Sequence, residues 1–138
     1  GQEEQGWWRE GKKIKVISLL DKDLPRIFSK DNEHVITLVF ADADPQRRDM
    51  EVTAPDYCTP AQAKQIVEFI DQIHNDPAET VLLVNCKYGL CRSGAVVDYV
   101  GQICCLGFWD QKGKNPQIVP NFWVRHLLFQ EYYTKDLH

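Results

Sequence analysis

Apolar and polar positions follow each other along this chain in short blocks that predict strands and helices in turn. The apolar runs at 14–19, 35–40 and 80–85 are short and rich in β-branched residues, which is typical of strands. Between the second and third runs, apolar residues recur at three- and four-residue steps and predict an amphipathic helix. These residues are Ala63, Ile66, Val67, Ile70 and Ile73.

The predicted elements also have recognisable ends. Thr59 followed by Pro60 predicts the start of the amphipathic helix, and the sequence 75–77 predicts its end. Further helices are expected at 23–28, over 95–104 and through 127–129.

The third apolar run decides the type of sheet that we expect. The run 80–85 is apolar at successive positions, which predicts a strand buried on both faces, as in a parallel sheet. Alternating strands and helices then predict an α/β fold. We expect a central, mostly parallel sheet of about four to five strands, flanked by helices on both faces.

Length and composition predict one globular domain. The chain has 138 residues, of which 43% are hydrophobic and 26% are charged, so a disordered tail or a coiled coil is not expected. We interpret 1–138 as a single domain, with 1–12 as a peripheral N-terminal extension. No apolar run approaches the roughly 18 residues of a membrane span, so we expect no membrane partner.

Charge and cysteine usage narrow the expected partners and compartment. The net charge is −4 and no basic run is present, so nucleic acid is not an expected partner. The five cysteines are odd in number and two are adjacent, which indicates reduced thiols and a cytoplasmic location. No Cys-x-x-Cys pair occurs and the four histidines are scattered, so no metal and no cofactor is expected. Nothing in the pattern indicates the oligomeric state.

The candidate chemistry lies in the turn between the third strand and the next helix. Anions bind at such a turn because unpaired N–H groups converge there and the helix dipole is positive. The turn begins with Cys86 and has Arg92 six residues later, with Gly89 between them to permit a tight curl. Inward amides and the planar guanidinium of Arg92 could hold an oxyanion, and the same positive field favours the thiolate of Cys86. A thiolate that faces a bound phosphate is a nucleophile aimed at phosphorus.

This segment resembles a known signature. Residues Val84–Gly94 are similar to the signature loop of the Cys-dependent protein tyrosine phosphatases, and most similar to the small dual-specificity group. The segments Ile66–Asp71 and Pro120–Leu128 agree with that group, and the resemblance extends from about Ile14 to Tyr133. It implies a fold like that of the protein tyrosine phosphatases and an enzyme that acts on phosphorylated proteins or peptides, with phosphotyrosine the first expectation.

The resemblance also implies roles for single residues. Cys86 would attack phosphorus and form a phosphocysteine intermediate without a metal, and Ser93 would stabilise the thiolate when it leaves. An aspartic acid would protonate the leaving oxygen, and Asp42 fits best by its position after the second strand. Asp44 lies close behind it, and Asp49 and Asp56 also remain possible. The phosphate would be held by Lys87, Tyr88, Gly89, Leu90, Cys91 and Arg92.

Some residues of the signature differ from the family pattern, so other functions also have to be considered. Family members usually carry His before the cysteine, where this chain has Asn85. Asn can donate a hydrogen bond but cannot carry a charge, so an alternative function is a pseudophosphatase that binds phosphorylated partners without turnover. Tyr88 is also bulkier than the residue common at its position. A third alternative is a Cys-dependent arsenate reductase or a rhodanese-like enzyme, which also use a cysteine in a phosphate-sized loop.

Overall fold

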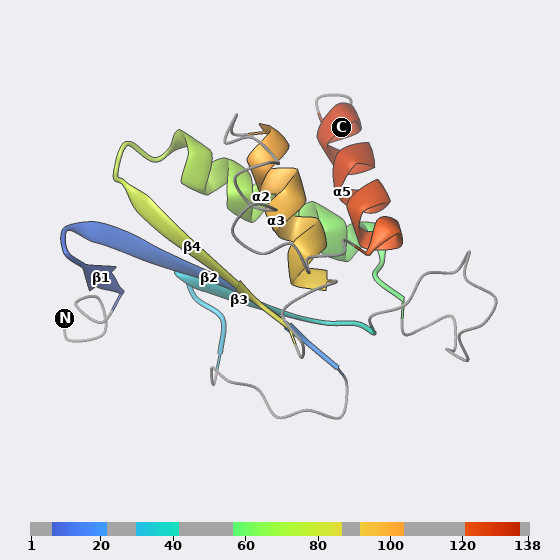
Figure 1. Ribbon diagram of the computed structural model, residues 1–138, viewed down its shortest axis with the longest axis horizontal. Helices are drawn as coiled ribbons and strands as arrows, with labels where there is room; N and C mark the ends of the chain where they lie inside the picture. Colours follow the sequence, from blue (N-terminus) through green and yellow to red (C-terminus); the bar gives the residue numbers. More distant parts are fainter. Residues whose placement is uncertain (1–6, 22–29, 42–56, 87–91, 104–120, 136–138) are drawn as a thin grey trace.

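The structure is a computed structural model that describes residues 7–21, 30–41, 57–86, 92–103 and 121–135 (Figure 1). Within these residues the chain forms four strands and three helices. The strands are β1 (Trp8–Arg9), β2 (Lys12–Leu20), β3 (Val35–Val39) and β4 (Thr80–Asn85). The helices are α2 (Pro60–Asn75), α3 (Arg92–Ile103) and α5 (Phe122–Thr134). The helix predicted at 23–28 lies outside the described residues.

The four strands form one mixed sheet with β2 in its centre. β3 and β4 run parallel to β2 on its two sides, whereas β1 runs antiparallel to the start of β2. The prediction of a mostly parallel sheet of four to five strands is therefore wrong. The chain reverses direction between β1 and β2 at Glu10 and Gly11, which both have positive φ. Two such residues make the tight hairpin turn that joins antiparallel strands.

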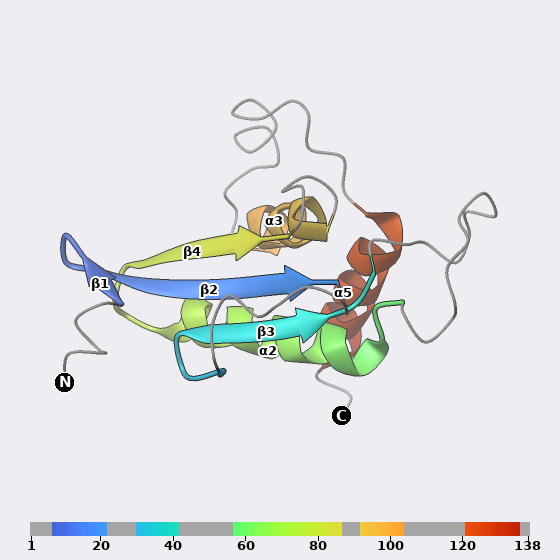
Figure 2. The ribbon, with the colours of Figure 1, turned by 90° about the horizontal axis from the view of Figure 1, so that it is seen from below.

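The three helices lie together on one face of this sheet (Figures 1 and 2). α5 packs against both α2 and α3. The hydrophobic core lies between the helices and this face of the sheet, and buried side chains from both sides fill it. They include Ile17, Leu19, Leu38, Ile66, Ile70, Val96, Val124 and Leu128. Helices on both faces were expected, but every helix of the described residues covers the same face.

β4 differs from its prediction in its burial. Leu82 and Val84 pack against the core on the helix side, as an interior strand would. Val81 and Leu83 point to the other face, where they are 39% and 51% exposed. The prediction that β4 is buried on both faces is therefore wrong. Apolar residues at successive positions give no information about whether a second layer covers the strand.

Hydrogen bonds from capping side chains fix where α2 and α5 begin. The Thr59 side chain accepts a hydrogen bond from the amide of Gln62, and the Gln62 side chain accepts one from the amide of Thr59. This reciprocal cap fixes the start of α2 at Pro60, as predicted. Asn121 caps α5 in a similar way by accepting a hydrogen bond from the amide of Val124. Among the described helices, none has the length and apolar character that crossing a membrane requires.

Candidate active site

The candidate site lies where the parallel strands end. Ser18 of β2 pairs with Asn85 of β4, so the next residues of the two strands emerge at the same edge of the sheet. Asp21 follows β2 directly and Cys86 follows β4 directly. α3 begins at Arg92 close to this edge (Figure 2). Ligands of parallel α/β sheets bind at such carboxyl ends of strands.

The thiol of Cys86 has a hydroxyl beside it. Cys86 Sγ lies 3.3 Å from Ser93 Oγ, which is within hydrogen-bond distance. Cys86 is half-buried and packs against the hydrophobic core on one side, and Ser93 is buried in the first turn of α3. The strand end and the helix start thus hold the two side chains together, and a hydroxyl so placed can donate a hydrogen bond to a thiolate.

The guanidinium of Arg92 is buried and oriented by the protein. Arg92 is only 2% exposed, and its Nη1 donates to Asp21 Oδ1 and to the carbonyl oxygen of Phe40, both at 2.8 Å. These two acceptors come from the ends of β2 and β3. A buried charge is costly unless it is paired and hydrogen-bonded, so this arrangement accounts for an arginine in the interior.

Three polar atoms at this edge are buried without a hydrogen-bond partner among the described residues. They are Nε of Arg92, Oδ1 of Asn85 and Oγ of Ser18, the residue that pairs with Asn85. A buried donor that no protein group satisfies is uncommon and costs roughly 1–3 kcal/mol. Nη1 of Arg92 is engaged by Asp21 and Phe40, whereas its Nε has no hydrogen-bond partner among the described residues.

The remaining predicted site residues lie outside the described residues. These are the phosphate-binding segment 87–91 and all four candidates for the general acid, Asp42, Asp44, Asp49 and Asp56. Of the predicted residues, the structure places Cys86 beside Ser93, and Arg92 begins the helix that carries Ser93. Within the described part of the chain, no cluster of three or more His, Cys, Asp or Glu is arranged to hold a metal ion.

Asp21 is a residue of the site that sequence reasoning missed. It directly follows β2 and lies 71 positions from Arg92 along the chain. Only its position directly after a strand could have indicated that Asp21 belongs to the site, because the carboxyl ends of parallel strands meet at one edge of the sheet. Asp42 was predicted as the general acid from the same kind of position, after the second strand.

Cys58 offers a contrast with Cys86. Cys58 is 2% exposed, and burial raises the pKa of its thiol from an ordinary 9.0 to about 12. A thiol with such a pKa stays protonated at neutral pH and is a poor nucleophile. Its backbone oxygen accepts a hydrogen bond from Trp123 Nε1 at 2.9 Å, so Cys58 serves to anchor α5.

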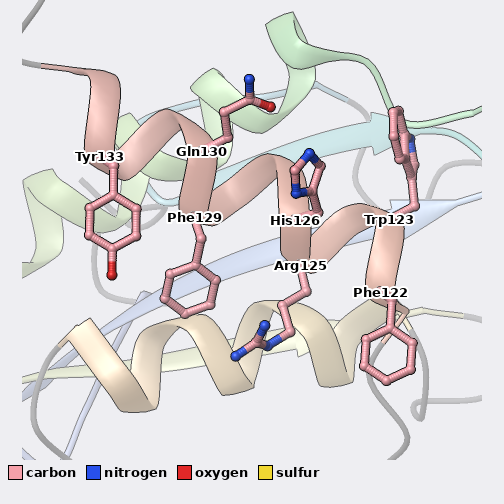
Figure 3. A pocket seen from close by; sticks show the side chains of 7 residues that line it. All are labelled: Phe122, Trp123, Arg125, His126, Phe129, Gln130 and Tyr133. Carbon is pink, nitrogen blue, oxygen red and sulfur yellow. The ribbon is translucent and has the colours of Figure 1, made fainter.

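A hollow of about 710 Å³ on the surface of α5 carries no comparable chemistry (Figure 3). The lining residues all belong to α5, and they are Phe122, Trp123, Arg125, His126, Phe129, Gln130 and Tyr133. Arg125 Nε donates to buried Asp98 at 2.6 Å, so its charge is paired within the protein. None of Cys86, Arg92 and Ser93 lines this hollow.

Comparison of the sequence with models of protein families and with curated proteins finds no match.

Proposed function

We propose that this protein is a metal-independent phosphomonoester hydrolase that works through a phosphocysteine, most simply a protein tyrosine phosphatase of the dual-specificity type. The observation that carries this proposal is the position of Cys86. Its sulfur follows a parallel strand, lies 3.3 Å from the Ser93 hydroxyl and precedes a helix that begins with buried Arg92. A nucleophile, a hydroxyl and a cation at one helix N-terminus suit reaction with a phosphate.

In the first step, the Cys86 thiolate attacks phosphorus and the bond from phosphorus to the leaving oxygen breaks. An aspartic acid, with Asp42 the first candidate, gives its proton to that oxygen. The negative charge on the equatorial oxygens is stabilised by the guanidinium of Arg92 and by loop amides. The fixed position of Arg92 supports this role, because an oriented donor needs no reorganisation during the reaction.

In the second step, water attacks phosphorus, the sulfur–phosphorus bond breaks, and the aspartate takes a proton from the water. The Cys86 thiolate is regenerated, and inorganic phosphate leaves. The hydroxyl of Ser93 is placed to donate a hydrogen bond to the departing sulfur. All electrons and protons are accounted for without a metal or a redox partner. The substrate would be a phosphorylated protein or peptide in the cytoplasm.

Phosphate release from a small aryl phosphate and from a phosphotyrosine peptide tests this proposal. The wild type should release phosphate from both substrates. In Cys86→Ser the rate of phosphate release should be at least about a thousandfold lower. Cys58→Ser is the matched control, because Cys58 is buried and its pKa of about 12 keeps it protonated. It should keep the activity at a temperature where it is folded.

Asn85 favours a second candidate, a pseudophosphatase that binds phosphorylated partners. Asn stands where the phosphatases usually carry His, and its Oδ1 is buried without a partner among the described residues. Titration of the wild type with the phosphotyrosine peptide separates the two functions. Binding without phosphate release supports the pseudophosphatase, whereas hydrolysis that persists in Cys86→Ser contradicts both.

A further inference from the structure

The two outer edges of the sheet differ in whether side chains of the described residues are hydrogen-bonded to their main-chain groups. β2 is the central strand, so β3 and β4 each have one edge that faces away from it. An open edge presents unpaired N–H and C=O groups to which another strand can add. Whether a given edge is blocked therefore indicates whether a partner strand can bind there.

The outer edge of β3 is blocked by side chains. The amide of Val35 donates to Asn32 Oδ1 at 3.2 Å, and the amide of Thr37 donates to Asp31 Oδ1 at 2.9 Å. Gln62 Nε2 donates to the carbonyl oxygen of Val39 at 2.9 Å. Side chains thus occupy outward groups at three positions of β3, and a further strand could pair there only by displacing these side chains.

Within the described residues, no side chain is hydrogen-bonded to the outer main-chain edge of β4. The amide of Lys13 donates to the carbonyl oxygen of Glu79 at 2.9 Å, so odd-numbered residues of this strand direct their main-chain groups toward β2. Main-chain groups alternate along a strand, so those of Thr80, Leu82 and Val84 face outward. Within the described residues β4 pairs with β2 alone. The strand carries no charged residue and no proline, the usual guards of an exposed edge.

We propose that β4 pairs antiparallel with β4 of a second copy of this chain, across a twofold axis at Leu82. This register sets Leu82 opposite Leu82 and Thr80 opposite Val84, and all the outward main-chain groups of these residues become paired. Isologous pairing of this kind closes at a dimer and continues the sheet through both copies.

The exposed side chains of β4 are complementary in this register. With the axis at Leu82, Val81 of each copy lies opposite Leu83 of the other, at a position where side chains approach closely. Val81 and Leu83 are 39% and 51% exposed, so each would cover an apolar residue that one copy leaves in water. The register also brings no like charges together, because Glu79 of one copy lies opposite Asn85 of the other and not opposite a carboxylate.

Sedimentation of the full chain over a range of concentrations tests the proposal. The wild type should move from a species of 16.0 kDa to one of twice that mass as its concentration rises. Leu83→Lys should weaken the dimer at least about tenfold, because it places a charge opposite Val81 and next to its symmetry mate. Val39→Lys is the matched control, since Val39 is 44% exposed on the same face of the sheet but belongs to the blocked strand β3.

Amide hydrogen exchange supplies a second measurement. The amides of Leu82 and Val84 should exchange slowly in the wild-type dimer and rapidly in Leu83→Lys, while the amide of Thr37 should be protected in both. A wild type that stays monomeric at high concentration overturns the proposal. So does a species larger than a dimer, a dimer that Leu83→Lys leaves intact, or one that Val39→Lys weakens equally.

Discussion

Asp21 Oδ1 lies 2.8 Å from Nη1 of Arg92, so a carboxylate at the end of the central strand holds the guanidinium that begins α3. The side chain of Arg92 is 2% exposed and that of Asp21 is 34% exposed. The pair therefore joins the buried cation to a carboxylate that water can reach. This contact fixes the direction of the guanidinium.

Replacement of Asp21 tests this contact. Asp21→Asn keeps the size of the side chain but removes its charge, which leaves the buried guanidinium with a weaker partner. We expect the free energy of unfolding to fall by roughly 1–3 kcal/mol, less than for a fully buried pair because Asp21 is partly hydrated. We also expect kcat/KM for an aryl phosphate to fall about tenfold, since Arg92 is no longer held in place. Denaturant unfolding and steady-state kinetics measure the two effects.

Asp71→Asn is the matched control for that substitution. Asp71 pairs with Lys135 at 3.0 Å, and both side chains are about as exposed as that of Asp21, at 31% and 30%. Loss of such a surface pair should cost less than about 1 kcal/mol and leave kcat/KM unchanged. Equal effects of the two substitutions would show that Asp21 has no special relation to Arg92.

Ser93→Ala should slow the second chemical step. The hydroxyl of Ser93 lies 3.3 Å from the Cys86 sulfur, and without it the departing thiolate loses a hydrogen bond. We expect kcat to fall about tenfold, which corresponds to roughly 1.4 kcal/mol, with a rapid burst of aryl alcohol equal to the enzyme. Stopped-flow absorbance shows the burst. Ser18→Ala, at another buried serine, should show none; an unchanged kcat without a burst in Ser93→Ala contradicts the role of Ser93.

The two described cysteines should differ in reactivity. Iodoacetamide at neutral pH should modify half-buried Cys86 first, and inorganic phosphate should slow this reaction by occupying the site. Cys58 should stay unmodified until the protein unfolds, because it is 2% exposed and its pKa is about 12. Peptide mass spectrometry follows both sites. Modification of Cys58 before Cys86 is the result that this interpretation does not allow.

The raised pKa of Cys58 predicts a loss of stability at high pH. The folded protein keeps the thiol proton up to about pH 12, whereas the unfolded chain loses it near 9.0. Between these values a rise in pH favours the unfolded chain, at up to about 1.4 kcal/mol per pH unit. In Cys58→Ala this contribution is absent, so its unfolding free energy should decline less steeply with pH. Parallel curves for the two proteins above pH 9.0 contradict the prediction.

Features that depend on neighbouring residues could be predicted from the sequence. The start of α2 follows from Thr59, Pro60 and Gln62, which lie within one turn of helix. The strands β2, β3 and β4 follow from compact apolar runs. The resemblance to the phosphatase signature implied that Cys86 and Ser93 act together, and their side chains lie 3.3 Å apart.

Features that depend on distant contacts could not be predicted. β1 has two residues, and its pairing depends on the hairpin at Glu10 and Gly11 rather than on a hydrophobic pattern. The exposure of Leu83 depends on which layers cover the sheet, which no periodicity reports. The contact of Asp21 with Arg92 spans 71 positions and has no local signal.

Direct detection of the phosphocysteine is the measurement closest to the central claim. Ser93→Ala mixed with an aryl phosphate and quenched in acid should carry a phosphoryl group on Cys86, identified by peptide mass spectrometry. The doubly substituted Cys86→Ser, Ser93→Ala protein should carry none at that position. Turnover of the aryl phosphate with no phosphoryl group on Cys86, or with one on another residue, would contradict the account.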